Sequence, residues 1–353
     1  MILKNSQVNS LKSPLDILPI EIKELFQFIF NRGFYLVMIG GAVRKFLSAV
    51  YDIGDVGDVG DSDLLGLDLD FEIRFEQREQ REQEHPLCVL SKLKDELLNN
   101  FSQNIIKNKI ILNDFGILIF NYCGYNLELS IPRIEKFKNN DFSHKNFTLE
   151  LDFQLPYKEA FARRDFSINA IGVEIRELNT FNTFKIIDPY NGVVDLKNKI
   201  LRPISGVFHK DPVRFLRAIR FHVRDSFAFS SELLQKFSFF DLRELSIHYF
   251  YLETIKSREF VRFVKLFYKL LDEYHIGIKL SEKISNLKIL TCLPEDLVID
   301  NSDMGKEDFL KMIWSNFSSF LSIEDFSLLW ISLECSKKKL KFFLKVKRRN
   351  LVK

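Results

Sequence analysis

The sequence predicts an α+β protein in which a small α/β head comes first and an all-α neck, body and tail follow. Strand patterns and helix patterns alternate through about the first 135 residues. From about residue 195 onward the apolar residues follow helical spacing. Hydrophobic residues make up 46% of the 353 residues, so the chain can bury a sizeable core and is not wholly disordered.

These patterns divide the chain into four expected segments. A helical extension occupies residues 1–30, and the head occupies residues 31–175. A helical neck is expected at 176–272, and a helical body with a basic tail at 273–353. A chain of this length suits two or three compact units.

The head is expected to begin with a helix at Pro19–Phe30 and a buried strand at Phe34–Ile39, which ends at Gly40 and Gly41. Four apolar residues share one face of that helix, namely Ile22, Leu25, Phe26 and Ile29. The other expected elements are helices at Ala42–Val50 and Cys88–Leu98, and strands at Leu67–Phe75, Ile110–Leu112, Gly116–Tyr122 and Tyr125–Ser130. A tight turn at Cys123 and Gly124 joins the last two strands.

Two polar segments interrupt the head. The stretch YDIGDVGDVGDSDLLG is rich in Gly and Asp and therefore predicts a loop. It lacks the Glu and Gly positions of an EF-hand, so we interpret it as solvated and not as a calcium site. The run EQREQREQEHP predicts a loop or a solvated helix end.

Helices are expected after the head at Asp211–Arg224, Ser230–Phe237 and Ser257–Leu271. The last segment, KKKLKFFLKVKRRNLVK, carries nine Lys or Arg residues. It suits contacts with RNA phosphates. The alternative is an amphipathic helix that packs on the body through Leu340, Phe343, Leu344 and Val346.

Several classes of protein are disfavoured by composition. The four cysteines lie far apart and form no CxxC pair, which argues against a zinc site and a disulfide framework. No apolar run reaches the length of a membrane span and the N-terminus lacks a signal-peptide core, so a cytoplasmic protein is expected. The net charge of +3 neither demands nor excludes a nucleic-acid partner.

The sharpest chemical signal is the pair Asp68 and Asp70 at the start of a strand. Alternate strand residues face the same side, so the two carboxylates repel each other and favour a divalent cation such as Mg²⁺ between them. Glu128 could add a third carboxylate from a neighbouring strand. DxD also arises by chance, and Asp61 and Asp63 form a second copy. We prefer Asp68 and Asp70 because they lead into the hydrophobic strand FEIRF, whereas the second copy lies in the Gly-rich loop.

Gly40 and Gly41 end a strand and precede a helix. Glycine lets backbone amides approach phosphate oxygens, and a helix N-terminus favours anions. Arg44 follows within one turn and could add a charged fork. A plain strand-to-helix turn explains a lone Gly pair equally well.

Taken together, six segments resemble the bacterial and eukaryotic tRNA nucleotidyltransferase and poly(A) polymerase family. They occur in the family's order over residues 35–222. The segments are GGAVRKFL, LDLDF, LELSIPRIEKF, FARRDFSINAIGVEI, IIDPYNGVVDLKNKILRPI and KDPVRFLRAIRF. The resemblance implies a nucleotidyltransferase-type head that adds C and/or A residues to tRNA 3′ ends from CTP and ATP.

The resemblance also implies roles for individual residues. Asp68 and Asp70 would bind Mg²⁺ and, with Glu128, would form the catalytic set. The residues implied to bind the nucleotide are Gly40, Gly41, Arg44, Arg164, Asp211, Arg214, Arg217 and Arg220. The helical neck and body would hold the tRNA acceptor arm.

Asp211 and Arg214 would read the base in this family, because a carboxylate only accepts hydrogen bonds and a guanidinium only donates them. The alternative is structural. Asp211 followed by Pro212 is also a favourable helix start, and an arginine stripe is often only solvated.

The sequence departs from the family pattern at Lys45, where Asp is usual, and at Lys210, where Glu is usual. The loop over Tyr51–Gly66 is longer than usual, and SREFVRFVKLF only loosely resembles a downstream family helix. Two alternatives therefore stay open. One is a poly(A) polymerase or an enzyme that adds only CC or only A. The other is an RNA-binding protein with a disabled site, against which the intact DxD argues.

Overall fold

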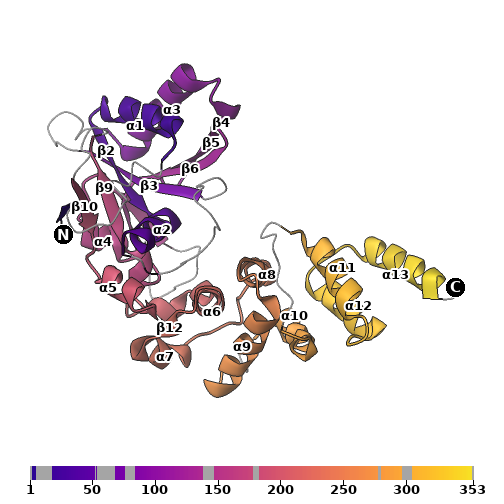
Figure 1. Cartoon of the computed structure of the whole chain (residues 1–353). Helices are drawn as coiled ribbons and strands as arrows, with labels where there is room; N and C mark the ends of the chain where they lie inside the picture. Colours follow the sequence, from indigo (N-terminus) through magenta and orange to yellow (C-terminus); the bar gives the residue numbers. More distant parts are fainter. Residues whose placement is uncertain are drawn as a thin grey trace. The chain divides into compact units, whose positions relative to one another are not determined.

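The computed structural model describes residues 2–4, 18–51, 53, 68–75, 84–137, 147–177, 183–276, 280–295 and 304–351. The chain divides into two compact units, Met1–Ser205 and Gly206–Lys353 (Figure 1). The first unit is built on a mixed β-sheet and the second is mainly helical, which confirms the α+β prediction. None of the helices in the described ranges has the length and apolar character needed to cross a membrane.

An eight-stranded sheet forms the centre of the first unit. In spatial order its strands are β1 (Ile2–Lys4), β10 (Thr183–Ile187), β9 (Gly172–Ile175), β2 (Phe34–Ile39), β3 (Asp68–Phe75), β6 (Tyr125–Ser130), β5 (Ile117–Tyr122) and β4 (Ile105–Asn113). Strands β3 and β6 pair in parallel, with Asp70 opposite Glu128, and every other neighbouring pair among these strands is antiparallel.

Helix α1 (Ile20–Phe30) packs against one face of the sheet. The other long helices of this unit are α2 (Gly40–Tyr51) and α3 (Pro86–Phe101). Helix α1 buries the four apolar residues predicted from its spacing. Its Phe26 ring meets the Phe71 ring edge-on, with centroids 4.9 Å apart. Phe71 follows Asp70 directly in β3, so Asp70 faces the opposite side of the sheet.

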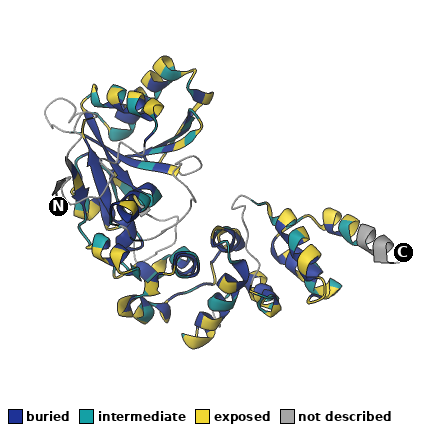
Figure 2. Cartoon of the chain, in the orientation of Figure 1, coloured by how far each residue is buried: buried dark blue, intermediate teal, exposed yellow. Residues whose placement is uncertain are grey.

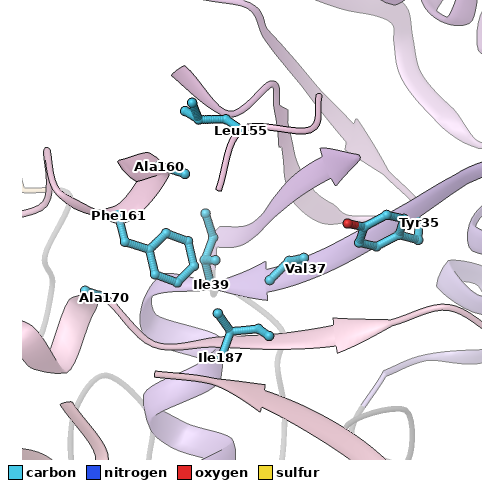
Figure 3. Packing of buried hydrophobic residues seen from close by; sticks show 8 residues of the cluster. All are labelled: Tyr35, Val37, Ile39, Leu155, Ala160, Phe161, Ala170 and Ile187. Atoms are coloured by element: carbon cyan, nitrogen blue, oxygen red, sulfur yellow. The ribbon is translucent and has the colours of Figure 1, made fainter. Parts of the chain in front are cut away.

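On the side of Asp70, a second cluster covers the sheet (Figure 3). It joins β2 to the segment that contains α4 (Tyr157–Phe161). Its buried members are Tyr35, Val37, Ile39, Leu155, Ala160, Phe161, Ala170 and Ile187. Ile39 pairs with Asp70 across β2 and β3, so this cluster borders the carboxylate end of the strand.

Three features differ from the expected organisation. Helix α1 belongs to the first unit, and so does segment 176–205, because β10 pairs with β9 there. Strand β4 is longer than the predicted strand at Ile110–Leu112. Its pairing with β5 shifts register between Ile105 and Ile110, where Lys107 and Asn108 have positive φ, and the strand continues through this bulge. The hairpin of β7 (Arg133–Phe137) and β8 (Phe147–Leu151) was not predicted. Of the two polar segments, 51–66 and 76–86, residues 52, 54–66 and 76–83 lie outside the described residues.

The second unit contains α6 (Pro212–Asp225), α7 (Ser231–Phe237), α8 (Ile247–Lys256), α9 (Phe260–Glu273), α10 (Glu282–Ser285), α11 (Lys306–Phe317), α12 (Ile323–Ser332) and α13 (Lys337–Leu351). Among the described side chains, these helices carry buried residues on one side and exposed residues on the other (Figure 2). Much of the core is phenylalanine, and the Phe215 ring meets Phe237 at 5.2 Å and Phe267 at 5.8 Å. Helix α8 lies between two predicted helices and was missed.

Helix α13 packs on the rest of this unit through two of the residues named for the amphipathic alternative. Leu340 is buried, and the Phe343 ring stacks on Trp330 of α12 with centroids 6.1 Å apart. Lys337, Lys338 and Lys341 are exposed. Residues 337–344 therefore combine buried and half-buried apolar side chains with exposed lysines.

Candidate active site

Three carboxylates gather where β3 and β6 run in parallel. Asp70 lies opposite Glu128 and Asp68 lies opposite Asn126, so all four side chains are on one face of the sheet. The Nδ2 of Asn126 donates a hydrogen bond of 3.4 Å to Asp68. Burial, and then the charges of Glu128 and Asp68, raise the pKa of Asp70 to about 7. Burial and the charge of Asp68 also raise the pKa of Glu128.

This donor set fits a hard divalent cation, because burial and then the charges of neighbouring carboxylates raise both pKa values, and a bound cation would relieve the repulsion between those charges. Within the described ranges, no three His, Cys, Asp or Glu side chains are grouped so that they could hold a metal ion by themselves. Mg²⁺ commonly takes only one or two carboxylates and completes its shell with water and phosphate oxygens. Asp68 and Asp70 therefore suit an open site that needs a phosphate-bearing ligand.

The N-terminus of α2 adjoins these carboxylates. The helix begins at Gly40, two residues before the start at Ala42 that the sequence predicted. Gly40 itself has a φ of +74°, which favours glycine. A Cβ atom at Gly40 would lie 2.6 Å from Oδ2 of Asp70. Gly40 thus brings the helix start, whose free amides favour anions, against the carboxylate edge.

Two arginines contribute positive charge at the same place. Arg164 and Arg44 each lie close enough to Asp70 to lower its pKa, opposing the larger effect of burial. The Arg164 guanidinium lies over the Phe161 ring, 5.3 Å from its centroid. The largely buried Arg44 donates a hydrogen bond to Asn169. Carboxylates and guanidiniums side by side suit a ligand that carries both a cation and phosphates.

Further arginines near this site were not assigned a role from the sequence. The charge of Arg133, at the start of β7, lowers the pKa of Glu128 against the larger effect of burial. Its Nε donates 3.3 Å to Glu135. Burial lowers the pKa of Arg163, and the nearby charges of Arg133 and Arg164 lower it further. The signal that could have found Arg133 is the R-x-E pattern that follows the Glu128 strand.

In the second unit, Asp211 and Arg214 lie together at the start of α6. Asp211 caps the helix, accepting a hydrogen bond of 2.9 Å from the backbone N–H of Val213. Its Oδ2 lies 3.7 Å from Nε of Arg214. Both side chains are partly exposed, at 31% and 17%. Asp211 is therefore a helix cap, as the structural interpretation predicted, and base reading by Asp211 and Arg214 stays a prediction.

The other two arginines of the stripe have different surroundings. Arg217 is half-buried and lies near the Phe221 ring. Arg220 is buried and forms an ion pair with Glu253 of α8, with 2.7 Å between Nε and Oε2. A buried charge that lost this partner would be costly, so the pair holds α6 to α8. Nucleotide binding by Arg217 and Arg220 stays a prediction.

The predicted site residues thus form two groups. One group lies in the first unit and consists of Gly40, Gly41, Arg44, Asp68, Asp70, Glu128 and Arg164. The other lies on and before α6 in the second unit and consists of Asp211, Arg214, Arg217 and Arg220.

Comparisons with known proteins find one family model and several relatives that match part of this chain. Residues 78–202 match the poly A polymerase head domain. The "Multifunctional CCA protein" of Xylella fastidiosa (strain 9a5c) is 37% identical over 116 residues, which are 33% of this chain and 26% of that protein. The "CCA-adding enzyme" of Buchnera aphidicola subsp. Cinara cedri is 37% identical over 106 residues, 30% of this chain and 23% of that protein. The matched part thus spans about a quarter of the length of these relatives.

The similarity in structure extends over more of the chain. The crystal structure of the Bacillus stearothermophilus CCA-adding enzyme in complex with CTP superposes with a TM-score of 0.57. The two sequences are 18% identical, and the superposition covers 94% of this chain and 68% of that enzyme. At this level of identity the similarity is one of fold. The head-domain match and the shared fold thus point the same way: residues 78–202 are similar to the poly A polymerase head domain, and the chain has a fold similar to that of a CCA-adding enzyme.

Proposed function

We propose that this chain is a template-independent RNA nucleotidyltransferase that adds C and/or A residues to tRNA 3′ ends from CTP and ATP, with release of pyrophosphate. The observation that carries the proposal is the parallel pairing of Asp70 with Glu128 beside the glycine start of α2 and two arginines. The names of the matched relatives, which refer to CCA addition, support the choice of substrates.

In the proposed reaction the RNA 3′-hydroxyl oxygen attacks the α-phosphorus of the nucleotide. A new phosphorus–oxygen bond forms, the bond to the β-phosphate oxygen breaks, and pyrophosphate leaves. Asp70 or Glu128 accepts the hydroxyl proton. When bound by Asp68 and Asp70, Mg²⁺ supplies charge neutralisation for the leaving group and lowers the pKa of the attacking hydroxyl.

Arg44, Arg164 and the amides at the start of α2 hold the triphosphate. A guanidinium can engage phosphate oxygens with two parallel hydrogen bonds, which fixes orientation as well as charge. Such positioning brings the α-phosphorus within reach of the hydroxyl, and positioning with electrostatic stabilisation supplies most of the catalysis in phosphoryl transfer.

Asp211 and Arg214 select the base. Arg214 donates to N3 and O2 of cytosine or to N1 of adenine, and Asp211 accepts from the exocyclic amine of either base. Uracil and guanine present a ring N–H where the arginine needs an acceptor. A buried polar group left without a partner costs about 1–3 kcal/mol, so these bases are rejected.

The helices of the second unit hold the tRNA acceptor arm. Double-stranded RNA is recognised mostly by its shape and by contacts to phosphate and 2′-hydroxyl groups, so exposed cations are sufficient. The exposed Lys337, Lys338 and Lys341 of α13 are suited to such contacts. Because a cation-lined helix reads no base edge, this surface contributes affinity for the tRNA more than choice of sequence.

A second candidate within the family is addition of A alone, up to a poly(A) tail. The observation that favours it is Lys210, which stands beside Asp211 where the family usually has Glu and so changes the charge next to the base-reading pair. Its added positive charge bears on the position of Asp211 and hence on discrimination between C and A.

The test is transfer of label from radioactive CTP and ATP, each alone and together, to tRNA lacking its 3′ CCA, with Mg²⁺. Growth by up to three nucleotides that needs both CTP and ATP supports CCA addition. A long ladder with ATP alone supports the poly(A) alternative. No transfer, with tRNA binding retained, would favour an RNA-binding protein. The Asp68→Asn, Asp70→Asn double variant is the control for contaminating activity.

A further inference from the structure

We propose that Asn169 is a positioning residue that holds the Arg44 guanidinium at the carboxylate site and ties it to Asp165. The hydrogen bonds themselves are independent of function, whereas the kinetic consequence rests on the proposed nucleotide transfer. Arg44 and Asn169 are 125 positions apart in the sequence, so a single amide side chain joins the motifs GGAVR and RRDFSINA.

Two hydrogen bonds carry this inference. Arg44 Nη1 donates to Oδ1 of Asn169. On its other side, Nδ2 of Asn169 donates 2.7 Å to Oδ1 of Asp165. The same Asp165 oxygen accepts from the backbone N–H of Phe166 at 2.8 Å, which anchors the carboxylate. The hydrogen bonds therefore form a chain that runs from the backbone N–H of Phe166 through Asp165 and Asn169 to Arg44.

The chemistry of the three side chains requires an amide in the middle. Arg44 offers only donors, and an ionised Asp165 offers only acceptors. Asn169 carries one acceptor oxygen and one donor nitrogen, and its two partners determine which way the amide points. Leucine offers neither group, and aspartate keeps the acceptor for Arg44 but places a second carboxylate against Asp165.

Asn169 stands on a rigid support. It ends a short helical turn, Ser167–Asn169, and is only 4% exposed. Ser167 Oγ donates 2.6 Å to Asp195, and the backbone N–H of Ser167 donates 3.0 Å to Arg202 O. A long arginine side chain loses considerable rotamer entropy when it is ordered, so a preformed acceptor at a fixed point reduces what the ligand must supply.

The place of Arg44 gives this support a consequence for binding. Its charge lowers the pKa of Asp70, and its Nη2 lies 3.9 Å from the position of a Cβ atom added at Gly41. The guanidinium is thus kept near both the helix start and Asp70, where the triphosphate is proposed to bind. Displacing it would weaken nucleotide binding before it altered the chemical step.

The test uses the full chain and two measurements. Side-chain NMR of the arginine N–H groups reports whether Arg44 is restrained, with its signal assigned by its loss in Arg44→Lys. Steady-state kinetics with CTP and a tRNA primer separates KM from kcat. Asn169→Leu should give a mobile Arg44 signal, raise KM for CTP about tenfold and change kcat by less than about threefold. Asn169→Asp, which keeps the acceptor, should retain a restrained Arg44.

Asn104→Leu is the matched control, because Asn104 is a half-buried asparagine of the same unit whose amide instead contacts Cys123. It should leave both readouts unchanged. An Arg44 signal that stays restrained in Asn169→Leu, or an unchanged KM in an active enzyme, would overturn the proposal. If Asn169→Leu does not fold, Asn169→Ala takes its place with the same expectations. If the wild-type chain transfers no nucleotide, the proposed function fails, and the NMR result still decides the role of Asn169.

Discussion

Gly40 and Asp70 are so close that a Cβ atom at Gly40 would lie 2.6 Å from the Oδ2 of Asp70. No real Cβ contact is that short, so a side chain at Gly40 must move the carboxylate. The positive φ of +74° adds a separate backbone preference for glycine. Gly40 is therefore a determinant of where the proposed metal ligand lies.

We expect Gly40→Ala to lower kcat/KM by about 100-fold, since misplacing a group by about 1 Å can cost that much. Its backbone strain should cost about 1–2 kcal/mol of stability. Gly33→Ala is the matched control, because Gly33 has a similar φ of +78° but nothing within 4 Å of an added Cβ. Equal activity losses in the two variants would show that strain, and not displacement of Asp70, is responsible.

Asp68→Asn and Asp70→Asn should each abolish nucleotide transfer while leaving tRNA binding nearly intact. Both substitutions keep the side-chain shape but remove the negative charge that a cation needs. Asp61→Asn with Asp63→Asn tests the other DxD, which lies outside the described residues. Loss of transfer in that pair, with activity retained at 68 and 70, would mean that the wrong carboxylates were chosen.

The pKa of Asp70, raised from 3.8 to about 7, predicts a pH dependence with a definite sign. The folded protein holds this proton more tightly than the unfolded chain, so the contribution to stability is complete below pH 3.8 and is lost as the pH rises through about 7. Mg²⁺ competes with the proton and should reverse that loss.

The increase in Tm caused by Mg²⁺ should therefore be larger at pH 8 than at pH 6, and calorimetry in buffers of different ionisation enthalpy should detect proton release near pH 7. Asp70→Asn should show neither effect. A Mg²⁺-induced change in Tm that is the same at both pH values would contradict the assignment of Asp70 as a ligand.

Sequence periodicity was sufficient to predict that Asp68 and Asp70 share a face, because the strand repeat is two residues. The prediction that Glu128 comes from a neighbouring strand is confirmed by the parallel register of β3 and β6. The helix Pro19–Phe30 was also predicted well, since its apolar residues follow helical spacing without interruption. The shared face of Asp68 and Asp70 and the apolar side of the helix are local patterns, and each can be read within one element.

Contacts between distant elements could not be predicted in the same way. No spacing rule joins Arg44 to Asn169, and a helical stripe of arginines does not reveal that Arg220 meets Glu253. The partner of Arg220 lies on α8, a helix that the apolar pattern did not identify. Which side of α6 is buried depends on the helices packed against it. Tertiary packing therefore decides that Arg220 is buried and Arg214 is partly exposed.

For the basic tail, charge and packing can be tested separately. Changing Lys337, Lys338 and Lys341 to Gln should leave Tm unchanged, since all three are exposed. It should reduce the slope of log K for tRNA against log salt by up to about 2–3 if each contacts a phosphate. Cutting the chain before Lys337 instead removes Leu340 and Phe343 from the core and should destabilise the unit. An unchanged salt slope in the triple variant would exclude these lysines as RNA contacts.

Finally, Asp211 should choose the base, and its second role as a helix cap determines how this must be tested. Asp211→Ala removes both the carboxylate and the cap that accepts from Val213, and loss of a cap alone typically costs about 1 kcal/mol of stability. Asp211→Asn keeps a capping oxygen, so α6 should begin as before, but it exchanges one acceptor for a donor where the base amine must be received.

The measurement is kcat/KM for CTP, ATP, UTP and GTP with the wild type and both variants. We expect Asp211→Asn to lose activity with CTP and ATP and to gain relative to them with UTP or GTP, with an unchanged Tm. The scale is about 1–3 kcal/mol for one lost hydrogen-bond partner, or roughly 5- to 150-fold in the ratio of specificities. If Asp211→Asn behaves as the wild type while Asp211→Ala lowers all four nucleotides equally, Asp211 acts only as a helix cap. In that case the base must be selected by other residues, and Arg214 would be the next to test.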